Sequence, residues 1–89
     1  MKAVRATVTG RVQGVSFRYY TEERALELGV TGWVRNEPDG SVALHAEGDD
    51  RAVDALVEWC RTGPAPARVR DVAVREATET GATMFETRH

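Results

Sequence analysis

Residues 2–29 read KAVRATVT, GRVQGVS and FRYYTEERALELG in succession, and this stretch decides the fold. In its first part, valine and alanine alternate with polar residues, the period of two that is typical of a half-buried strand. We therefore predict a strand over Lys2–Thr9 that stops at Gly10. A loop with two glycines follows, and the last part contains no Gly or Pro before Gly29.

The segment after the loop is predicted to be a helix that ends at Gly29, because glycine suits the left-handed conformation of a C-terminal cap. One side of this helix carries these residues at helical spacing: Phe17, Tyr20, Thr21, Arg24, Ala25 and Leu28. Leu26 lies off that stripe, so the helix is predicted from its ends and its spacing together.

The middle of the chain predicts a hairpin and a second helix. Strands over Val30–Asn36 and Ser41–Glu47 flank the sequence Glu-Pro-Asp-Gly, in which Pro and Gly favour a tight turn. Asp49 or Asp50 is suited to cap the helix that follows. The core-facing stripe of this helix is Val53, Leu56, Val57 and Cys60. Gly63 and Pro64 are predicted to end the helix.

A strand over Val69–Glu76 completes the order βαββαβ, and the tail Thr83–Arg88 has room for one more short strand around Phe85. This order predicts a ferredoxin-like α+β fold, a mostly antiparallel sheet with two helices on one face. The sequence contains no internal repeat or linker. We therefore expect a single domain over residues 1–89.

The composition limits the partners of the protein. A formal net charge of −2 argues against capture of nucleic acid or of an anionic membrane, since both need a concentrated basic surface. Cys60 is the only cysteine, and the chain has no secretory apolar run and no segment long enough to span a bilayer. We expect a cytoplasmic protein that binds any anion through a few specific groups, and nothing in the sequence demands more than a monomer.

The loop Gly10–Ser16 connects the end of a strand to the start of a helix. Several backbone N–H groups lack partners there, and the helix dipole presents its positive end, so the site suits a phosphate. Arg18 in the first helical turn opposes that dipole unless an anion is bound, and its planar group fits two phosphate oxygens. From these residues alone, a plain connection beside a solvated Arg18 is an equally good interpretation. The loop lacks the GxxxxGK[ST] pattern of a nucleotide-binding P-loop.

Asn36 comes directly before the predicted turn. Its uncharged amide is able to orient a water molecule without repelling a phosphate. On its own, however, an Asn before Pro-Asp-Gly is more often a turn former.

Two motifs resemble the paired signature of acylphosphatases: GRVQGVxFR over residues 10–18 and GWVRN over residues 32–36. The resemblance extends over nearly the whole chain and implies a ferredoxin-like fold, hydrolysis of carboxyl-phosphate anhydrides and no cofactor. It further implies that Arg18 binds phosphate and that Asn36 orients water. The residues it implies for the phosphate-binding loop are Gln13, Gly14, Val15, Ser16 and Phe17.

This chain departs from the family pattern at two places. The tail reads Thr87-Arg88-His89 where a hydrophobic residue, Arg and Tyr are usual, and Glu37 stands where a threonine is frequent. The first change affects terminal packing, and the second places a carboxylate near a bound dianion. Neither change touches Arg18 or Asn36.

The chemistry of an acyl phosphate needs few groups. It expels a carboxylate whose conjugate acid has a pKa of roughly 4, so the leaving group requires no proton from an enzyme acid. We expect a phosphate oxygen to accept the proton of the attacking water. A metal is not expected, because His45 on the outer face of its strand and His89 in the tail have no metal-ligand spacing. Cys60 is expected in the core, and Trp33 likewise.

Two other functions fit the same residues. A non-catalytic anion-binding or regulatory module would need the same loop. A domain of a larger carbamoyl-phosphate-handling maturation protein would carry the same motifs. The chain starts at a methionine and ends soon after its last predicted strand, which favours a free-standing enzyme as the first expectation.

Overall fold

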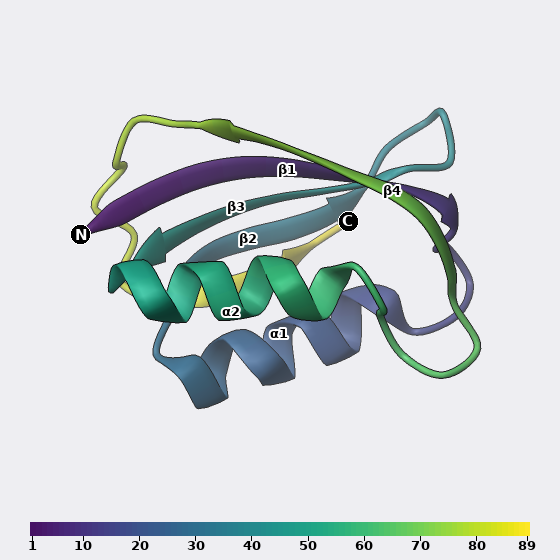
Figure 1. Ribbon diagram of the computed structural model, residues 1–89, viewed down its shortest axis with the longest axis horizontal. Helices are drawn as coiled ribbons and strands as arrows, with labels where there is room; N and C mark the ends of the chain where they lie inside the picture. The colour runs from purple at the N-terminus through teal and green to yellow at the C-terminus, as the bar shows by residue number, and fades with distance from the viewer.

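Five strands form one sheet, and two helices cover one of its faces (Figure 1). This computed structural model describes residues 1–89. The elements are β1 (Lys2–Arg11), α1 (Phe17–Leu28), β2 (Thr31–Asn36), β3 (Val42–Gly48), α2 (Asp50–Cys60), β4 (Arg68–Glu76) and β5 (Phe85–Arg88).

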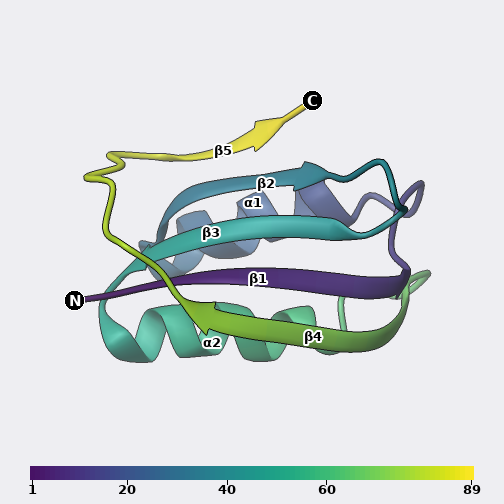
Figure 2. The same ribbon diagram turned by 90° about the horizontal axis from the view of Figure 1, so that it is seen from above.

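The strands lie in the order β4-β1-β3-β2-β5, as Figure 2 shows from above. β3 pairs antiparallel with both β1 and β2, β4 pairs antiparallel with β1, and β5 pairs parallel with β2. Each helix therefore connects two parallel strands that have a third strand between them, and right-handed connections put both helices on the same face. The predicted ferredoxin-like α+β fold is confirmed, with the additional strand at one edge.

The core lies between the sheet and the helices. Val8, Val34 and Leu44 point to this face and are fully buried. The predicted stripe of α2 is confirmed, and Asp49 caps this helix by accepting a hydrogen bond from the amide of Arg51 at 3.2 Å. Cys60 lies in the core, where burial raises the pKa of its thiol to about 12.

The buried stripe of α1 is narrower than predicted. Phe17, Thr21 and Ala25 are its buried residues, whereas Tyr20 and Arg24 are exposed, so the prediction was wrong for these two. These three residues are spaced four apart and so form one narrow line along the helix. A line of this width is sufficient to pack the helix against one side of the sheet. The buried hydroxyl of Thr21 is satisfied because it donates to the Phe17 carbonyl at 2.8 Å. The cap at Gly29 is confirmed, with a φ of 73°.

Most strand ends lie within one residue of the prediction, but the ends of β1 and α2 differ by more. β1 continues past Gly10 to Arg11, because a bulge between Thr9 and Gly10 lets the strand pair further with β4. Gly10 has a φ of 121°, and a Cβ atom there would lie 2.2 Å from the Arg68 carbonyl oxygen. α2 ends at Cys60, three residues earlier than Gly63, because the next amides turn back to the carbonyls of its last turn.

No helix covers the outer face of the sheet (Figure 1), yet three large side chains on it are buried. Trp33, His45 and Glu47 expose 7%, 1% and 4% of their surface. Trp33 was predicted in the core, and the structure places it on the opposite face. His45 lies on the outer face as predicted, although it is buried there.

Glu47 fastens the connection between β4 and β5 to the sheet. Its carboxylate accepts hydrogen bonds from the Thr80 amide at 2.9 Å, the Thr80 hydroxyl, the Gly81 amide at 3.3 Å and the His45 ring at 2.6 Å. Burial raises the pKa of Glu47, but these hydrogen bonds outweigh burial and lower the pKa to about 2. The charged form of Glu47 therefore stabilises the path of the chain into β5.

We predict that Glu47→Gln lowers the free energy of unfolding by about 1–3 kcal/mol at neutral pH, because the charge-assisted bonds are lost. In the wild type this stabilisation is complete above a pH of about 4.5, the ordinary pKa, and is lost as the pH falls towards about 2. Urea unfolding at several pH values measures it. The variant should lose this part of the pH dependence, whereas Glu79→Gln, an exposed carboxylate in the same connection, should keep it.

Candidate active site

The loop between β1 and α1 presents a run of free backbone donors. The amides of Gln13 to Ser16 donate to no protein acceptor, and the first amide that bonds back into α1 is that of Tyr20, to the Ser16 carbonyl at 3.2 Å. Gly14 and Ser16 both have positive φ values, 74° and 61°. Left-handed residues at such positions bend a loop sharply, and in backbone nests a bend of this kind turns successive amides towards a bound anion.

The start of α1 has no internal partner for its dipole. Ser16 is the N-cap residue but its side chain makes no capping hydrogen bond, and the first turn contains no acidic residue. A left-handed conformation for a non-glycine residue is also strained. The positive end of α1 is thus left free for an external anion. Gly10, the other glycine of the predicted loop, does not take part in this bend, because it belongs to the bulge of β1.

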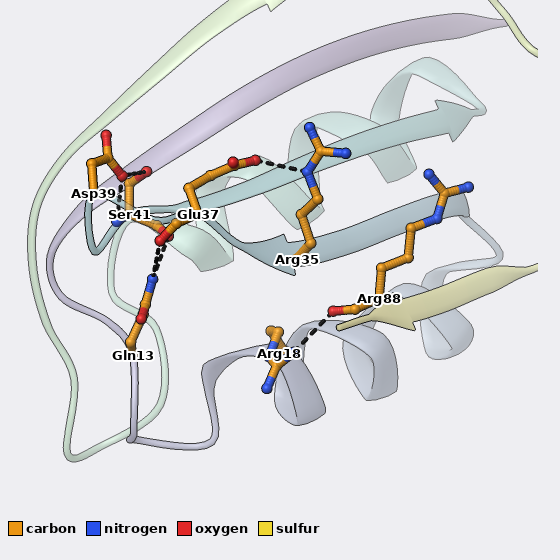
Figure 3. A network of polar contacts seen from close by, with 7 residues as sticks. All are labelled: Gln13, Arg18, Arg35, Glu37, Asp39, Ser41 and Arg88. Atoms are coloured by element: carbon orange, nitrogen blue, oxygen red, sulfur yellow. Dashed lines mark hydrogen bonds and ion pairs between the residues drawn. The ribbon is translucent and has the colours of Figure 1, made fainter.

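Arg18 projects from the first turn of α1 towards the end of β5 (Figure 3). Its Nη1 donates to the Arg88 carbonyl at 2.9 Å and lies 3.2 Å from Nδ1 of His89. These contacts use one nitrogen of the guanidinium. The rest of its planar donor set remains available for an oxyanion.

Asn36 ends β2 on the same side of the sheet as Val34, the face that the helices cover. It lines a concave pocket of about 550 Å³ that Arg18 also lines. The other lining residues are Val12, Gly14, Ser16, Phe17, Tyr19, Glu22, Thr87 and His89. The two side chains predicted to carry the chemistry thus come from separate elements and line one pocket.

Gln13 and Val15 do not line this pocket with their side chains. The Gln13 amide nitrogen donates to the carbonyls of Glu37 and Ser41 at 2.8 and 2.9 Å, on both sides of the β2–β3 turn (Figure 3). Val15 packs into the core. Gln13 therefore attaches the loop to the residue that follows Asn36, and Val15 anchors the loop from below.

Four residues at the pocket were not identified from the sequence: Tyr19, Glu22, Thr87 and His89. The change in the tail was expected to leave Arg18 untouched, yet His89 contacts it. The Thr87 hydroxyl donates to the Glu22 carboxylate at 2.7 Å, which links α1 to β5. These two residues are far apart in the chain, and no local spacing indicates that they meet. Tyr19 is exposed and follows Arg18 directly, and this adjacency is the feature of the sequence that could have indicated its place at the pocket.

The charged side chains at the site are few. Arg18 supplies a cation and Glu22 a carboxylate that Thr87 already contacts. No group of three His, Cys, Asp or Glu side chains in the chain is placed to hold a metal ion. Arg35 turns away to the outer face, where its Nε donates to the Glu37 carboxylate at 2.7 Å. Glu37 is therefore held away from the pocket by its own ion pair.

Comparison with known proteins points to one family. The family model described as Acylphosphatase matches residues 4–87. A protein of Nocardioides sp. named Acylphosphatase is 60% identical over 86 residues, which cover 97% of this chain and 87% of that protein. The crystal structure of acylphosphatase from Bacillus subtilis matches with a TM-score of 0.96 and 37% identity, with 100% of both chains covered. T. kodakarensis HypF matches with a TM-score of 0.87 and 28% identity, over 100% of this chain but 12% of that one.

We predict that Gln13→Glu is less stable than Gln13→Ala, and that both are less stable than the wild type. Ala removes two hydrogen bonds, at a cost of about 1–2 kcal/mol, whereas Glu turns a carboxylate towards two carbonyl oxygens. Chemical denaturation measures this order. Wild-type stability in Gln13→Glu would show that the bridge to the turn does not hold the loop.

Proposed function

This chain belongs to the acylphosphatase family and hydrolyses acyl phosphates, and we propose that Arg18 and the loop amides hold the phosphoryl group while Asn36 orients the attacking water. The observation that carries this assignment is the shared pocket, because Arg18, Asn36, Gly14 and Ser16 all line one cavity, and the amides of Gly14 and Ser16 have no protein acceptor.

The phosphoryl group would bind between the loop and Arg18. The amides and the helix dipole supply positive potential without a titratable acid. The guanidinium is able to donate two parallel hydrogen bonds. As the bond from phosphorus to the acyl oxygen breaks, negative charge stays on the phosphoryl oxygens and develops on the carboxylate. Fixed donors that already point at this group lower the barrier, since they need no rearrangement.

Asn36 would align the water. The amide is able to accept a hydrogen bond from water with its oxygen and donate one with its nitrogen, which fixes the lone pair that attacks phosphorus. The new bond joins the water oxygen to phosphorus, the acyl oxygen leaves as a carboxylate, and a phosphate oxygen takes the water proton. This route uses positioning and charge stabilisation, with no covalent intermediate on the enzyme.

A route without metal or protein nucleophile agrees with the residues at the site. Cys60 is buried in the core away from the pocket, and burial holds its thiol protonated by raising its pKa to about 12. We further propose that the enzyme acts in the cytoplasm as a monomer. No helix has the length and apolar character needed to cross a membrane.

We predict that benzoyl phosphate is hydrolysed in the presence of EDTA and that an ordinary phosphate monoester is not. Arg18→Ala should raise KM about tenfold or more, because phosphate binding is weakened in the ground state as well. Asn36→Ala should lower kcat by about 100- to 1000-fold with little change in KM, because water alignment matters only in the reaction itself. Steady-state kinetics separate the two effects.

Arg24→Ala is the matched control, because Arg24 lies on the same helix but is exposed and away from the pocket. It should keep wild-type kinetics. Equal activity in the wild type, Arg18→Ala and Asn36→Ala would refute the residue assignment. Phosphate binding without any turnover would favour the non-catalytic anion-binding module, and activity that EDTA abolishes and a divalent ion restores would refute the metal-free route.

The carboxylate of Glu22 provides a separate test of the proton acceptor. If a phosphate oxygen takes the proton, we predict that Glu22→Gln keeps kcat within about threefold of the wild type, because the amide still accepts the Thr87 hydrogen bond. The pH dependence of kcat should then lack a carboxylate step in both proteins. A loss of 100-fold or more, together with loss of such a step, would identify Glu22 as the base instead.

A further inference from the structure

The outer face of the sheet gathers positive charge in a chain whose net charge is −2. Strand pairing places five side chains of this face in one row across the sheet. From β4 to β5 they are Arg75, Arg5, His45, Trp33 and Glu86. In the adjacent row, Arg35 lies opposite Arg88. Two pairs of arginines therefore face each other directly, an arrangement that is destabilising unless other charges compensate it.

Three guanidinium groups surround the ring of Trp33. Their central carbons lie 4.8 Å (Arg5), 4.5 Å (Arg35) and 5.1 Å (Arg88) from the ring centroid. Such contacts with an indole face are favourable, and they bury the ring without a covering helix. They also bring three like charges close together. The cluster therefore depends on where each guanidinium finds its counter-charge.

Two of these arginines have carboxylate partners of their own. Arg35 pairs with Glu37 at 2.7 Å and Arg88 pairs with Glu86 at 2.9 Å. Arg5 differs, because its Nε donates to Nδ1 of His45 at 3.0 Å.

The hydrogen bond from Arg5 determines which ring nitrogen of His45 carries the proton. Since Nδ1 accepts from Arg5, the ring proton lies on Nε2, which donates to the Glu47 carboxylate at 2.6 Å. His45 is then neutral. The charge of Glu47 is taken up by Thr80 and Gly81 as well as by the His45 ring. Arg5 therefore has no direct carboxylate partner.

Arg75, opposite Arg5, forms no ion pair either, and it is exposed. Both arginines line a hollow of about 440 Å³ between the sheet and the β2–β3 turn, and Arg35 lines it from the other side. Between these arginines the hollow is lined by the small side chains of Thr7 and Ala43, which lie opposite each other in the neighbouring row of the sheet. The long side chains of the arginines thus surround a shallow base that contains the Thr7 hydroxyl.

The carboxylates at this hollow are already engaged. Glu37 pairs with Arg35, and Asp39 accepts hydrogen bonds from the amide and hydroxyl of Ser41 at 2.9 and 2.6 Å. The Ser41 bonds lower the pKa of Asp39, so it stays charged and turned into the hairpin. Three guanidinium groups against two carboxylates leave an excess of positive charge, and that excess lies on the side of Arg5 and Arg75.

We propose that this hollow, the outer-face site formed by Arg5, Thr7, Arg35 and Arg75, binds a small oxyanion that is a phosphate or a carboxylate. Two guanidinium groups without carboxylate partners supply the donors for its oxygens, and the Thr7 hydroxyl supplies one more. A small ligand fits the size of the hollow and the local excess of charge. A polyanion would meet the acidic remainder of the surface.

The outer-face site is separate from the active-site pocket. Arg18 and Arg35 lie on opposite sides of the sheet in Figure 3, and the two concavities have no lining residue in common. This separation makes it possible to observe one site without the other. The chain has two tryptophans, one for each side. Trp33 lines the outer-face hollow, whereas Trp59 packs on Phe17 at the start of α1, with ring centroids 5.6 Å apart.

The test uses the full chain with Arg18→Ala and Trp59→Phe, so that the active site is weakened and Trp33 is the single fluorophore. Potassium phosphate and potassium acetate are titrated in separate series, each against potassium chloride at matched ionic strength. We expect a saturable change in Trp33 fluorescence with phosphate, acetate or both. The comparison of the two series identifies which oxyanion the site prefers.

Adding Arg75→Gln should weaken that binding about tenfold or more, because one of the two unpaired guanidinium groups is lost. Arg75 is exposed, so the fold is expected to tolerate this change. Arg70→Gln, an exposed arginine of the same strand that does not line the hollow, is the matched control and should bind as the parent does. Arg5→Lys should give intermediate affinity, because it keeps the charge but loses the planar donor set.

Three outcomes would overturn the proposal. In the first, chloride produces the same fluorescence change as phosphate and acetate at equal ionic strength, which would mean simple screening. In the second, Arg75→Gln and Arg70→Gln have equal effects. In the third, a short oligothymidine binds this face far more tightly than either small anion, which would identify a nucleic-acid surface in its place.

Discussion

Side chains alternate strictly between the two faces of β2, and both proposed sites of the molecule depend on this alternation. Val34 and Asn36 point to the helices, whereas Trp33 and Arg35 point to the outer face. Gly32 holds the register at the start of the strand, since a Cβ atom there would lie 1.8 Å from the His45 carbonyl oxygen. A slip by one residue would exchange the two faces, removing Asn36 from its pocket and burying Arg35 in the core.

The two faces of the sheet are closed by different physical means. On the helix side, apolar side chains of both layers pack together, and burial of apolar surface supplies the stabilisation. On the outer side, buried groups are covered by long polar side chains and by the connection that Glu47 holds. The second kind of cover leaves donors near the surface, which an apolar layer would not. Four arginines, Arg5, Arg35, Arg75 and Arg88, thus lie on the face that has no helix.

Local patterns were sufficient to predict the order of elements, the turn after Asn36 and the cap at Gly29, because each depends on residues close together in the chain. The end of β1 was not predictable in this way, since the bulge at Gly10 is set by its pairing with β4. The same reason applies to Glu22 and Thr87, which are brought together only by the fold. Burial of Trp33 on the outer face escaped prediction because arginines, which usually face water, form its cover.

The role of Arg18 and Asn36 rested on the family motifs more than on periodicity, and the structure adds the reason that they lie together. Gln13 joins the loop to the turn after β2, so the proposed phosphate-binding loop and Asn36 are attached to each other through one side chain. The family motif includes Gln13, but the sequence alone does not indicate that its side chain bridges the loop and the turn. Its function is visible only when the hairpin and the loop are seen side by side (Figure 3).

The last strand belongs to both surfaces at once. The carbonyl of Arg88 holds Arg18 at the pocket, while the guanidinium of the same residue covers Trp33 on the other side.

The double role of this strand has a practical consequence for anyone who handles the protein. An affinity tag attached after His89 would start at the rim of the pocket, next to Arg18. The first residue lies at the far end of the molecule beside Asp50, so purification handles and surface attachment are better placed there (Figure 2).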